Sequence, residues 1–193
     1  MVETIMHGDV TLRPLTKEDV SLLWDIYEPE VFEFMLHRIE SMEQMEKWLQ
    51  AGIQQMNVDR SAFAFVVENT KTKEVIGSTR IYGIDHTNLV CEIGSTFYAK
   101  KFQRTHVNTT CKYLLLTYCF ETLGMIRVQF KTDALNIASK RAIERIGGVR
   151  EGLLRNERIR SNGTVRDAVV YSIIDSEWPV VKNELSLLMN KYS

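Results

Sequence analysis

The feature that most constrains the fold of this chain is a long apolar segment that follows a short polar loop. Residues 107–123 repeat apolar side chains at helical spacing on two adjoining stripes, which predicts a helix that is apolar over most of its circumference. Gly124 ends this helix in the manner usual for a helix C-terminus. A helix with so little polar surface has to be buried on most sides, so the other elements are expected to pack around it.

The same region is free of acidic residues from residue 93 to residue 120, although Asp and Glu are common elsewhere. Helices usually carry acids in the first turn, where carboxylates complement the positive end of the helix dipole. Here the preceding loop carries basic residues instead, Arg104 among them. Free backbone N–H groups beside such a dipole end favour phosphate. The alternative is an ordinary solvated helix start, capped by Thr105 or Asn108.

The remaining elements alternate along the chain. Strand patterns occur at residues 10–15, 62–67, 75–82, 89–98, 125–132, 149–160 and 164–174. Helical patterns with capping residues occur at residues 16–28, 41–53, 107–123, 136–146 and 176–192, where Ser176 is expected to open the last helix. Asn162-Gly163 predicts a hairpin, and Gly94 inside a strand predicts a bulge or a close ligand approach. The order is a mixed α/β pattern, an antiparallel meander followed by crossover units, in a single domain over residues 1–193.

Composition excludes several classes of protein. The net charge of −1 gives no basic field that would favour nucleic acid. No apolar run is long enough to span a membrane, and the amino terminus lacks the pattern of a signal peptide. The three cysteines, Cys91, Cys111 and Cys119, are odd in number and lack CxxC spacing. They predict buried thiols in a reducing compartment, hence the cytoplasm, and no metal site.

Three motifs occur in an order known from one family. They are QRTHVN at residues 103–108, Asn136 and Ser139 on a helix that ends at Ile146-Gly147, and Arg166-Asp167 ahead of VVYS at residues 169–172. With these motifs the chain resembles the GNAT N-acetyltransferase superfamily, and within it the RimJ/RimL-like branch. The resemblance covers residues 10–178. It implies an α/β (α+β) fold with a central mixed, mostly antiparallel sheet of about seven strands flanked by helices.

The resemblance also implies that acetyl-CoA is the co-substrate and that no metal is required. Family members hold the pyrophosphate with backbone N–H groups of the loop, and pair the pantetheine arm with the strand before it. The cofactor-binding residues implied here are Phe97, Tyr98, Gln103, Arg104, Thr105, His106, Val107, Asn108, Asn136 and Ser139.

One position of the phosphate loop departs from the family. His106 stands where the family has its main glycine, a residue that allows positive φ and a close ligand approach. Two outcomes are open. The histidine side chain turns outward while its N–H still faces the pyrophosphate, or the loop has lost its ligand.

Two residues are candidates for the chemistry of acetyl transfer. Glu92 lies on the strand that lines the acetyl site in the family and is the candidate base; the alternative is a solvated carboxylate. Ser139 is the candidate acid toward the leaving thiolate; the alternative is that it helps to cap its helix. No nucleophile is needed, so the cysteines receive no role. His7, His37 and His86 are isolated and are expected to be surface or packing residues.

The resemblance therefore implies an acetyl-CoA-dependent N-acetyltransferase whose acceptor is a primary amine, either a protein N-terminus or a small amine. The family suggests a homodimer. A degenerate member that binds CoA, or nothing, and serves as an interaction module is the alternative. A nucleotide-binding protein of another fold is a third. Arg155, Arg158 and Arg160 near the last hairpin predict either a solvated face or a guide for an acidic peptide.

Overall fold

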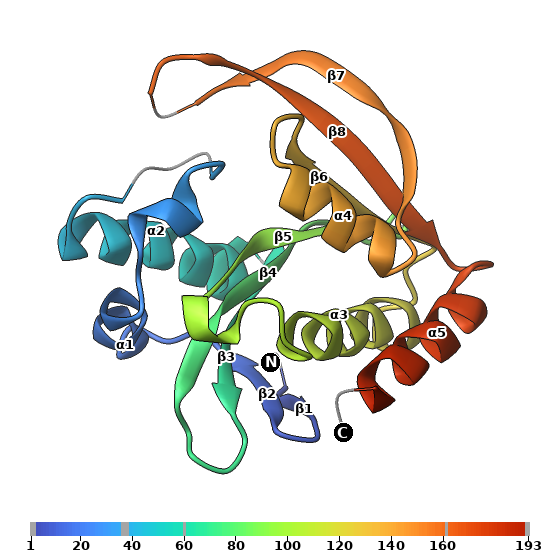
Figure 1. Cartoon of the computed structure of the whole chain (residues 1–193), viewed down its shortest axis with the longest axis horizontal. Coiled ribbons are helices and arrows are strands. Elements are labelled where there is room, and N and C mark those ends of the chain that lie inside the picture. The colour runs from blue at the N-terminus through green and yellow to red at the C-terminus, as the bar shows by residue number, and fades with distance from the viewer. Residues whose placement is uncertain (1–2, 36–38, 60, 161, 192–193) are drawn as a thin grey trace.

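The computed structural model describes residues 3–35, 39–59, 61–160 and 162–191. These residues form one eight-stranded sheet with five α-helices around it (Figure 1). The strands are β1 (Ile5–His7), β2 (Val10–Pro14), β3 (Ala62–Asn69), β4 (Val75–Asp85), β5 (Val90–Tyr98), β6 (Arg127–Asp133), β7 (Val149–Ile159) and β8 (Val165–Ile174). The helices are α1 (Asp19–Asp25), α2 (Met42–Gln54), α3 (Val107–Thr117), α4 (Ile137–Arg145) and α5 (Trp178–Asn190). Single 3₁₀ turns occur at Pro29–Phe32 and Lys100–Phe102, and π turns extend α2 over Gln55–Asp59 and α3 over Tyr118–Thr122.

The sheet has the order β1-β2-β3-β4-β5-β6-β8-β7, and only β5 and β6 are parallel neighbours. Their pairing is short, because only Val90–Glu92 is in register with Arg127–Gln129. Both strands continue further, so the edge of β5 from residue 93 onward is not paired with β6. Because the two strands are parallel, the segments that lead into α3 and α4 leave the sheet at the same end.

A β-bulge distorts β5 just beyond the last pair with β6. Ser95 and Thr96 lie opposite the single residue Thr79 of β4. Ser95 has φ 48, in the left-handed region that a residue with a Cβ atom seldom adopts. The distortion predicted from Gly94 is confirmed, although its centre is the neighbouring serine.

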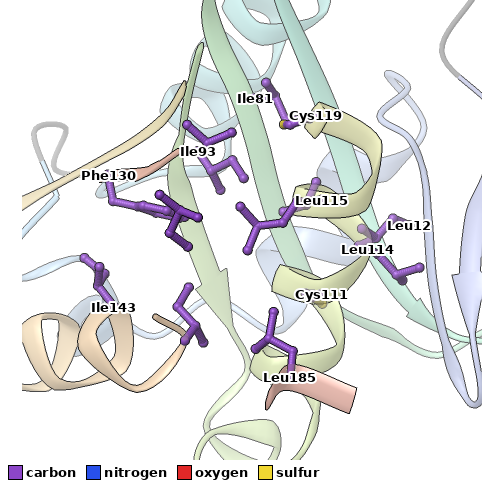
Figure 2. Packing of buried hydrophobic residues seen from close by; sticks show 14 of the residues in the cluster. Leu12, Ile81, Ile93, Cys111, Leu114, Leu115, Cys119, Phe130, Ile143 and Leu185 are labelled. Atoms are coloured by element: carbon purple, nitrogen blue, oxygen red, sulfur yellow. The ribbon is translucent and has the colours of Figure 1, made fainter. Parts of the chain in front are cut away.

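Helices cover both faces of the sheet. On one face, α3, α4 and α5 pack around the main core, in which Leu115 of α3 is fully buried and points toward the strands (Figure 2). On the other face, α1 and α2 cover a second core that includes Leu23 and Leu49. Burial of each such leucine stabilises the fold by about 1.5–3 kcal/mol. The β7–β8 hairpin arches away from this body, and most of β7 is exposed (Figure 1).

The seven predicted strands are confirmed, and β1 is an eighth that sequence reasoning missed. Three residues are too few for an alternating pattern to be read. The central helix is confirmed, with its last part a π turn. The prediction that Ser176 opens the last helix is wrong: α5 begins at Trp178, and the Ser176 N–H is bound by the preceding Asp175. Among the described residues, none of the helices has the length and apolar composition that crossing a bilayer requires.

Candidate active site

Helix α3 begins with backbone N–H groups that have no acceptor. The N–H groups of Arg104, Thr105, Asn108 and Thr109 make no hydrogen bond to any described residue. The first turn contains no acidic residue, and the N-cap residue, His106, makes no side-chain hydrogen bond to the helix. Free N–H groups at the positive end of a helix dipole bind anions. The start of α3 therefore has the form of the phosphate site that the acid-free stretch predicts.

The side chain of His106 lies outside this group of N–H donors. Its Nε2 atom is 2.8 Å from Oδ1 of Asp9, in the turn between β1 and β2. The residue has φ −65 and ψ −21, which is ordinary right-handed backbone. The positive φ of the loop belongs to Arg104, at 61. Position 106 therefore does not use the positive φ that a glycine would allow. The outward orientation is the one observed.

The other loop residues mostly brace the loop itself. The Gln103 side chain donates to the carbonyl of Tyr98 at 3.1 Å. The Thr105 hydroxyl donates to the carbonyl of Phe102 at 2.7 Å and accepts from the N–H of Val107 at 3.3 Å. Thr105 is thus a weak partial cap, and Val107 itself is buried. These contacts fix the turn that presents the free N–H groups.

The strand residues before the loop are buried on opposite faces. Phe97 packs into the core under α1 and α2, and Tyr98 into the core around α3. The Tyr98 hydroxyl lies 3.4 Å from Oδ1 of Asn108, so Asn108 does not cap α3. Burial raises the pKa of Tyr98 well above its ordinary value. Only the backbone of these two strand residues is placed to meet a ligand, at the edge of β5 that β6 leaves unpaired.

The start of α4 brings the next two predicted residues together. Oδ1 of Asn136 accepts from the N–H of Ser139 at 2.9 Å, so the asparagine caps the helix. Ser139 contributes its N–H to this cap and not its hydroxyl. That hydroxyl is half-buried and has no hydrogen-bond partner among the described residues. It is therefore available to a ligand, and the alternative in which Ser139 acts as the cap is not what is observed.

Glu92 is a buried carboxylate held by three donors. The Tyr82 hydroxyl donates to Oε1 at 2.6 Å, the Gln129 amide donates to Oε2 at 2.8 Å, and Nζ of Lys131 lies 3.1 Å from Oε2. The residue is 7% exposed, so the alternative of a solvated carboxylate is wrong. Gly94 makes room for this network, since a Cβ there would lie 2.6 Å from the Tyr82 hydroxyl.

Sequence reasoning missed a buried lysine under the bulge. Nζ of Lys112 on α3 donates to the Thr96 hydroxyl at 3.0 Å, and that hydroxyl is 2.7 Å from the hydroxyl of Thr79. The lysine is 7% exposed, and burial lowers its pKa to about 8. A single lysine within an apolar helix was the available signal. Its partner lies 16 residues earlier, on β5, which is too far along the chain for helical or strand spacing to indicate the pairing.

Sequence reasoning also missed an ion-pair network on the face of the sheet that carries Glu92. Lys131 lies 3.9 Å from Glu157, and Arg166 lies 3.9 Å from Glu157 and 4.0 Å from Asp133. Arg160 donates two hydrogen bonds to Asp133, from Nε to Oδ2 at 2.7 Å and from Nη2 to Oδ1 at 3.0 Å. Burial, the largest single effect, opposes ionisation of Asp133. The hydrogen bonds from Arg160 and the Leu135 N–H and the charges of Arg160 and Arg166 together outweigh it, so the pKa of Asp133 is lowered.

The arginines near the hairpin thus divide into two kinds. Arg155 and Arg158 are exposed, in agreement with a solvated face. Arg160 has a side chain that is only 15% exposed, and for this residue the prediction of a solvated charge is wrong. All three cysteines are free and buried, as predicted. His7 and His86 are exposed, and His37 lies outside the described residues.

The chain matches the family model of the acetyltransferase (GNAT) domain over residues 9–149, well over half of its length. The protein therefore belongs to the GNAT family and is an N-acetyltransferase.

Three known proteins illustrate the relationship. An acetyltransferase structure from T. thermophilus, with its activity given provisionally, is 33% identical, covers 97% of each chain and has a TM-score of 0.87. YdaF of Bacillus subtilis (strain 168), provisionally named a ribosomal N-acetyltransferase, is 34% identical over 102 residues, which are 53% of this chain and 55% of YdaF. Its name supports the RimJ/RimL-like branch. Spermidine N-acetyltransferase from Vibrio cholerae, solved with CoA and spermine, is 22% identical with a TM-score of 0.75 and shares the fold over 90% of this chain and 99% of its own.

Proposed function

We propose that this enzyme transfers the acetyl group of acetyl-CoA to a primary amine by direct attack. The observation that carries the proposal is the set of free N–H groups at the start of α3, next to the unpaired edge of β5. The free N–H groups suit a diphosphate, because helix N-termini bind phosphate groups. The unpaired edge of β5 offers strand-like hydrogen bonds to the amide groups of a pantetheine arm. The residues present thus fit coenzyme A, which the V. cholerae protein of the same fold was solved with.

The residues of this chain would share the binding as follows. Arg104, Thr105 and Asn108 offer N–H groups to the diphosphate, and the braces from Gln103 and Thr105 keep that turn in place. Phe97 and Tyr98 act through their backbone. His106 and Val107 contribute as part of the turn, and Asn136 acts by orienting the start of α4, where Ser139 faces the leaving group.

Bound at this site, acetyl-CoA supplies an acetyl group activated as a thioester. Glu92 accepts the proton of the attacking amine through the carboxylate lone pair that its three donors leave free. The Ser139 hydroxyl donates a hydrogen bond to the leaving sulfur. An N–H of the bulged strand stabilises the oxygen of the thioester carbonyl. The amine nitrogen bonds to the acetyl carbon as the carbon–sulfur bond breaks. Overall, the amine loses one proton and the leaving thiolate gains one, which gives the amide and free CoA.

The acceptor is a primary amine of one of two classes. The name of YdaF points to a protein amino terminus, and the name of the V. cholerae relative points to a small amine. We place the enzyme in the cytoplasm because its cysteines are free thiols. A homodimer stays a prediction.

The test is a titration of the protein with acetyl-CoA by thermal shift, followed by thiol release with a panel of amines. A ligand that binds only the folded state raises the melting temperature as its concentration exceeds Kd. A shift together with thiol release is the expected result. A shift without turnover on any amine would support the non-catalytic alternative. No shift with acetyl-CoA, but one with ATP, would contradict both.

A further inference from the structure

The bulge of β5 is held from the side of α3 by a chain of polar side chains. At this bulge, Ser95 and Thr96 lie opposite the single residue Thr79 of β4. The Thr96 hydroxyl lies 2.7 Å from the Thr79 hydroxyl and 3.4 Å from the Gly94 carbonyl, so it contacts both strands at the distortion. Lys112 of α3 donates to the same hydroxyl at 3.0 Å. A single hydroxyl thus joins the two strands at the bulge, and a lysine donates to it.

Lys112 is a buried cation. It is 7% exposed, and among the described residues no carboxylate forms an ion pair with it; its acceptor is the neutral Thr96 hydroxyl. Burying a charge is costly unless it is paired, and a methionine of similar length would fill the same core without that cost. Burial lowers the pKa of Lys112 to about 8, because the ammonium form is disfavoured there. Packing therefore gives no reason for a cation at this position, whereas its place beneath the bulge gives one.

The other titratable groups around Lys112 are thiols and a phenol. Charge interactions connect the lysine with Cys111 of α3 and with Cys119 of the π turn that follows. Burial raises the pKa of Cys111 to about 12 and raises the pKa of Cys119 well above its ordinary value. Burial likewise raises the pKa of Tyr98 of β5, and Cys91 of β5 lies against Cys119, with 3.6 Å between the sulfurs. As the pH rises through about 8, Lys112 is therefore the group of this cluster that loses its charge.

A positive charge beneath the bulge suits the chemistry proposed for β5. Negative charge develops on the thioester oxygen as the amine attacks, and an N–H of the bulged strand is the proposed donor to that oxygen. A cation on the buried side of the same strand strengthens this stabilisation, because charges interact more strongly in a core of low dielectric than in water. The hydrogen bond to Thr96 adds a fixed geometry, so one side chain both holds the strand and supplies the charge.

On the basis of the proposed acetyl transfer, we propose that Lys112 is a positioning residue for the thioester. Its ammonium group holds Thr96 and thereby keeps the bulge in the shape that directs an N–H of β5 at the thioester oxygen, and its charge favours the negative charge that forms there. Lys112 acts through the strand and touches neither the acetyl group nor the acceptor. It therefore contributes to kcat and little to the affinity for acetyl-CoA, because its effect grows as the transition state forms.

The first arm of the test measures thiol release by wild type and Lys112→Met as a function of pH. At about pH 7, Lys112→Met should lower kcat about 10-fold and change the KM for acetyl-CoA by less than about 3-fold. The ratio of the two kcat values should then fall at least about 3-fold by about pH 9.5, because wild type loses the charge that the variant lacks. Taking the ratio cancels the titration of the acceptor amine, which is common to both proteins.

Lys47→Met, which changes an exposed lysine of α2, is the matched control and should keep the wild-type kcat throughout. A kcat of Lys112→Met close to wild type would overturn the inference. A lowered kcat whose ratio to wild type does not change with pH would also overturn it, because altered packing has no such pH dependence.

The second arm observes the thioester directly and needs no acceptor. Acetyl-CoA labelled with carbon-13 at the carbonyl is bound to each protein, and its carbonyl stretch is measured by infrared difference spectroscopy. Hydrogen bonds and nearby positive charge polarise a carbonyl and lower this frequency. Near neutral pH, wild type and Lys47→Met should lower it relative to free acetyl-CoA. Lys112→Met should lower it less, and so should wild type at about pH 9.5. Equal frequencies in wild type and Lys112→Met would overturn the inference.

The two arms separate this inference from the proposed function. A carbonyl shift that depends on Lys112, without acetylation of any amine, would contradict the transfer and keep the positioning role. Acetylation with the same carbonyl frequency in both proteins would overturn the positioning role and keep the transfer. If Lys112→Met does not fold, Thr96→Val takes its place, because it removes the hydroxyl that the lysine holds. Its kcat should fall about 10-fold, and a wild-type kcat would overturn the inference.

Discussion

The two sides of β5 are built in opposite ways. At the start of α3, the charged groups are few, the first turn has no acid, and the available donors are backbone N–H groups. On the face that carries Glu92, donors and acceptors are side chains drawn from β4, β5, β6, β7 and β8, joined by ion pairs. Under the proposed function, a ligand at the first side would be held by the main chain, and a ligand at the second by side chains. Single substitutions on the face that carries Glu92 should therefore affect catalysis most. Acetyl-CoA affinity should change most when a substitution adds a negative charge at the start of α3.

The largest effect is expected at the carboxylate of the side-chain face. Glu92→Gln keeps the shape of the group but removes its ability to accept a proton, so kcat should fall about 100-fold. Thiol release at saturating acetyl-CoA measures this. Glu151→Gln, which changes a carboxylate paired with Arg127 on the same sheet, is the matched control and should stay near wild type. A Glu92→Gln enzyme with wild-type kcat would remove the base from the mechanism.

The second-largest effect is expected at the start of α3, where the available donors are backbone N–H groups. Asn108→Asp adds a carboxylate to the acid-free first turn of α3. It should raise the free energy of unfolding of the unliganded protein by about 0.5 kcal/mol, because the carboxylate complements the helix dipole. It should also weaken acetyl-CoA binding about 30-fold by repelling the diphosphate. Denaturation and calorimetry measure the two quantities. Asn162→Asp in the hairpin turn should change neither, and unchanged acetyl-CoA affinity in Asn108→Asp would place the phosphates elsewhere.

A smaller effect tests the free hydroxyl at the start of α4. Ser139→Ala should lower kcat about 10-fold and leave acetyl-CoA affinity unchanged, because we propose that the hydroxyl acts on the leaving sulfur, and it does not cap the helix. Ser176→Ala, next to a different helix start, serves as the control. Steady-state kinetics with a separate binding measurement distinguishes the two parameters. Loss of binding with kcat intact would make Ser139 a cofactor contact only.

The pH dependence of stability tests the buried lysine between the two sides. The folded pKa of Lys112 is lowered from 10.5 to about 8 by burial. Above pH 8 the unfolded chain therefore binds more protons at this group than the folded chain, and stability should rise with pH. Between about pH 7.5 and 9 the expected gain is about 1 kcal/mol. This figure is the contribution of Lys112 alone. The buried thiols of Cys111, whose pKa burial raises to about 12, and Cys119, whose pKa burial also raises, act in the opposite direction as the pH approaches 9.

Urea denaturation across this pH range measures the change. Lys112→Met should remove the rise, and Lys47→Met, which changes an exposed lysine, should keep it. If wild type and Lys112→Met showed the same pH dependence over this window, Lys112 would stay charged in the folded protein.

The smallest effect is expected at the position that departs most from the family. His106→Gly removes the contact with Asp9 and should lower stability by about 1 kcal/mol. It should change acetyl-CoA affinity by less than about 3-fold, because the ring lies outside the group of N–H donors. Asp9→Ala removes the same contact without altering the loop. A large loss of acetyl-CoA affinity in His106→Gly alone would make the imidazole part of the site.

The fold and the main-chain side of the site were largely predictable from sequence. Apolar spacing placed seven strands and the central helix, and the missing acids marked the start of α3. The orientation of His106 was not predictable, because Asp9, its partner, is 97 residues away in the sequence. The same holds for Glu92, whose burial depends on Tyr82, Gln129 and Lys131 from two other strands.

By itself, the sequence determined the order of elements, the family and the charge of the phosphate loop, since these depend on residues close together in the chain. The tertiary structure alone decided which side chains face one another across β5, where the bulge falls, and that a lysine is buried beneath it. The physical reason is that helix dipoles and periodic burial act over one or two turns. Ion pairs and desolvation depend on distances that only the packed sheet defines.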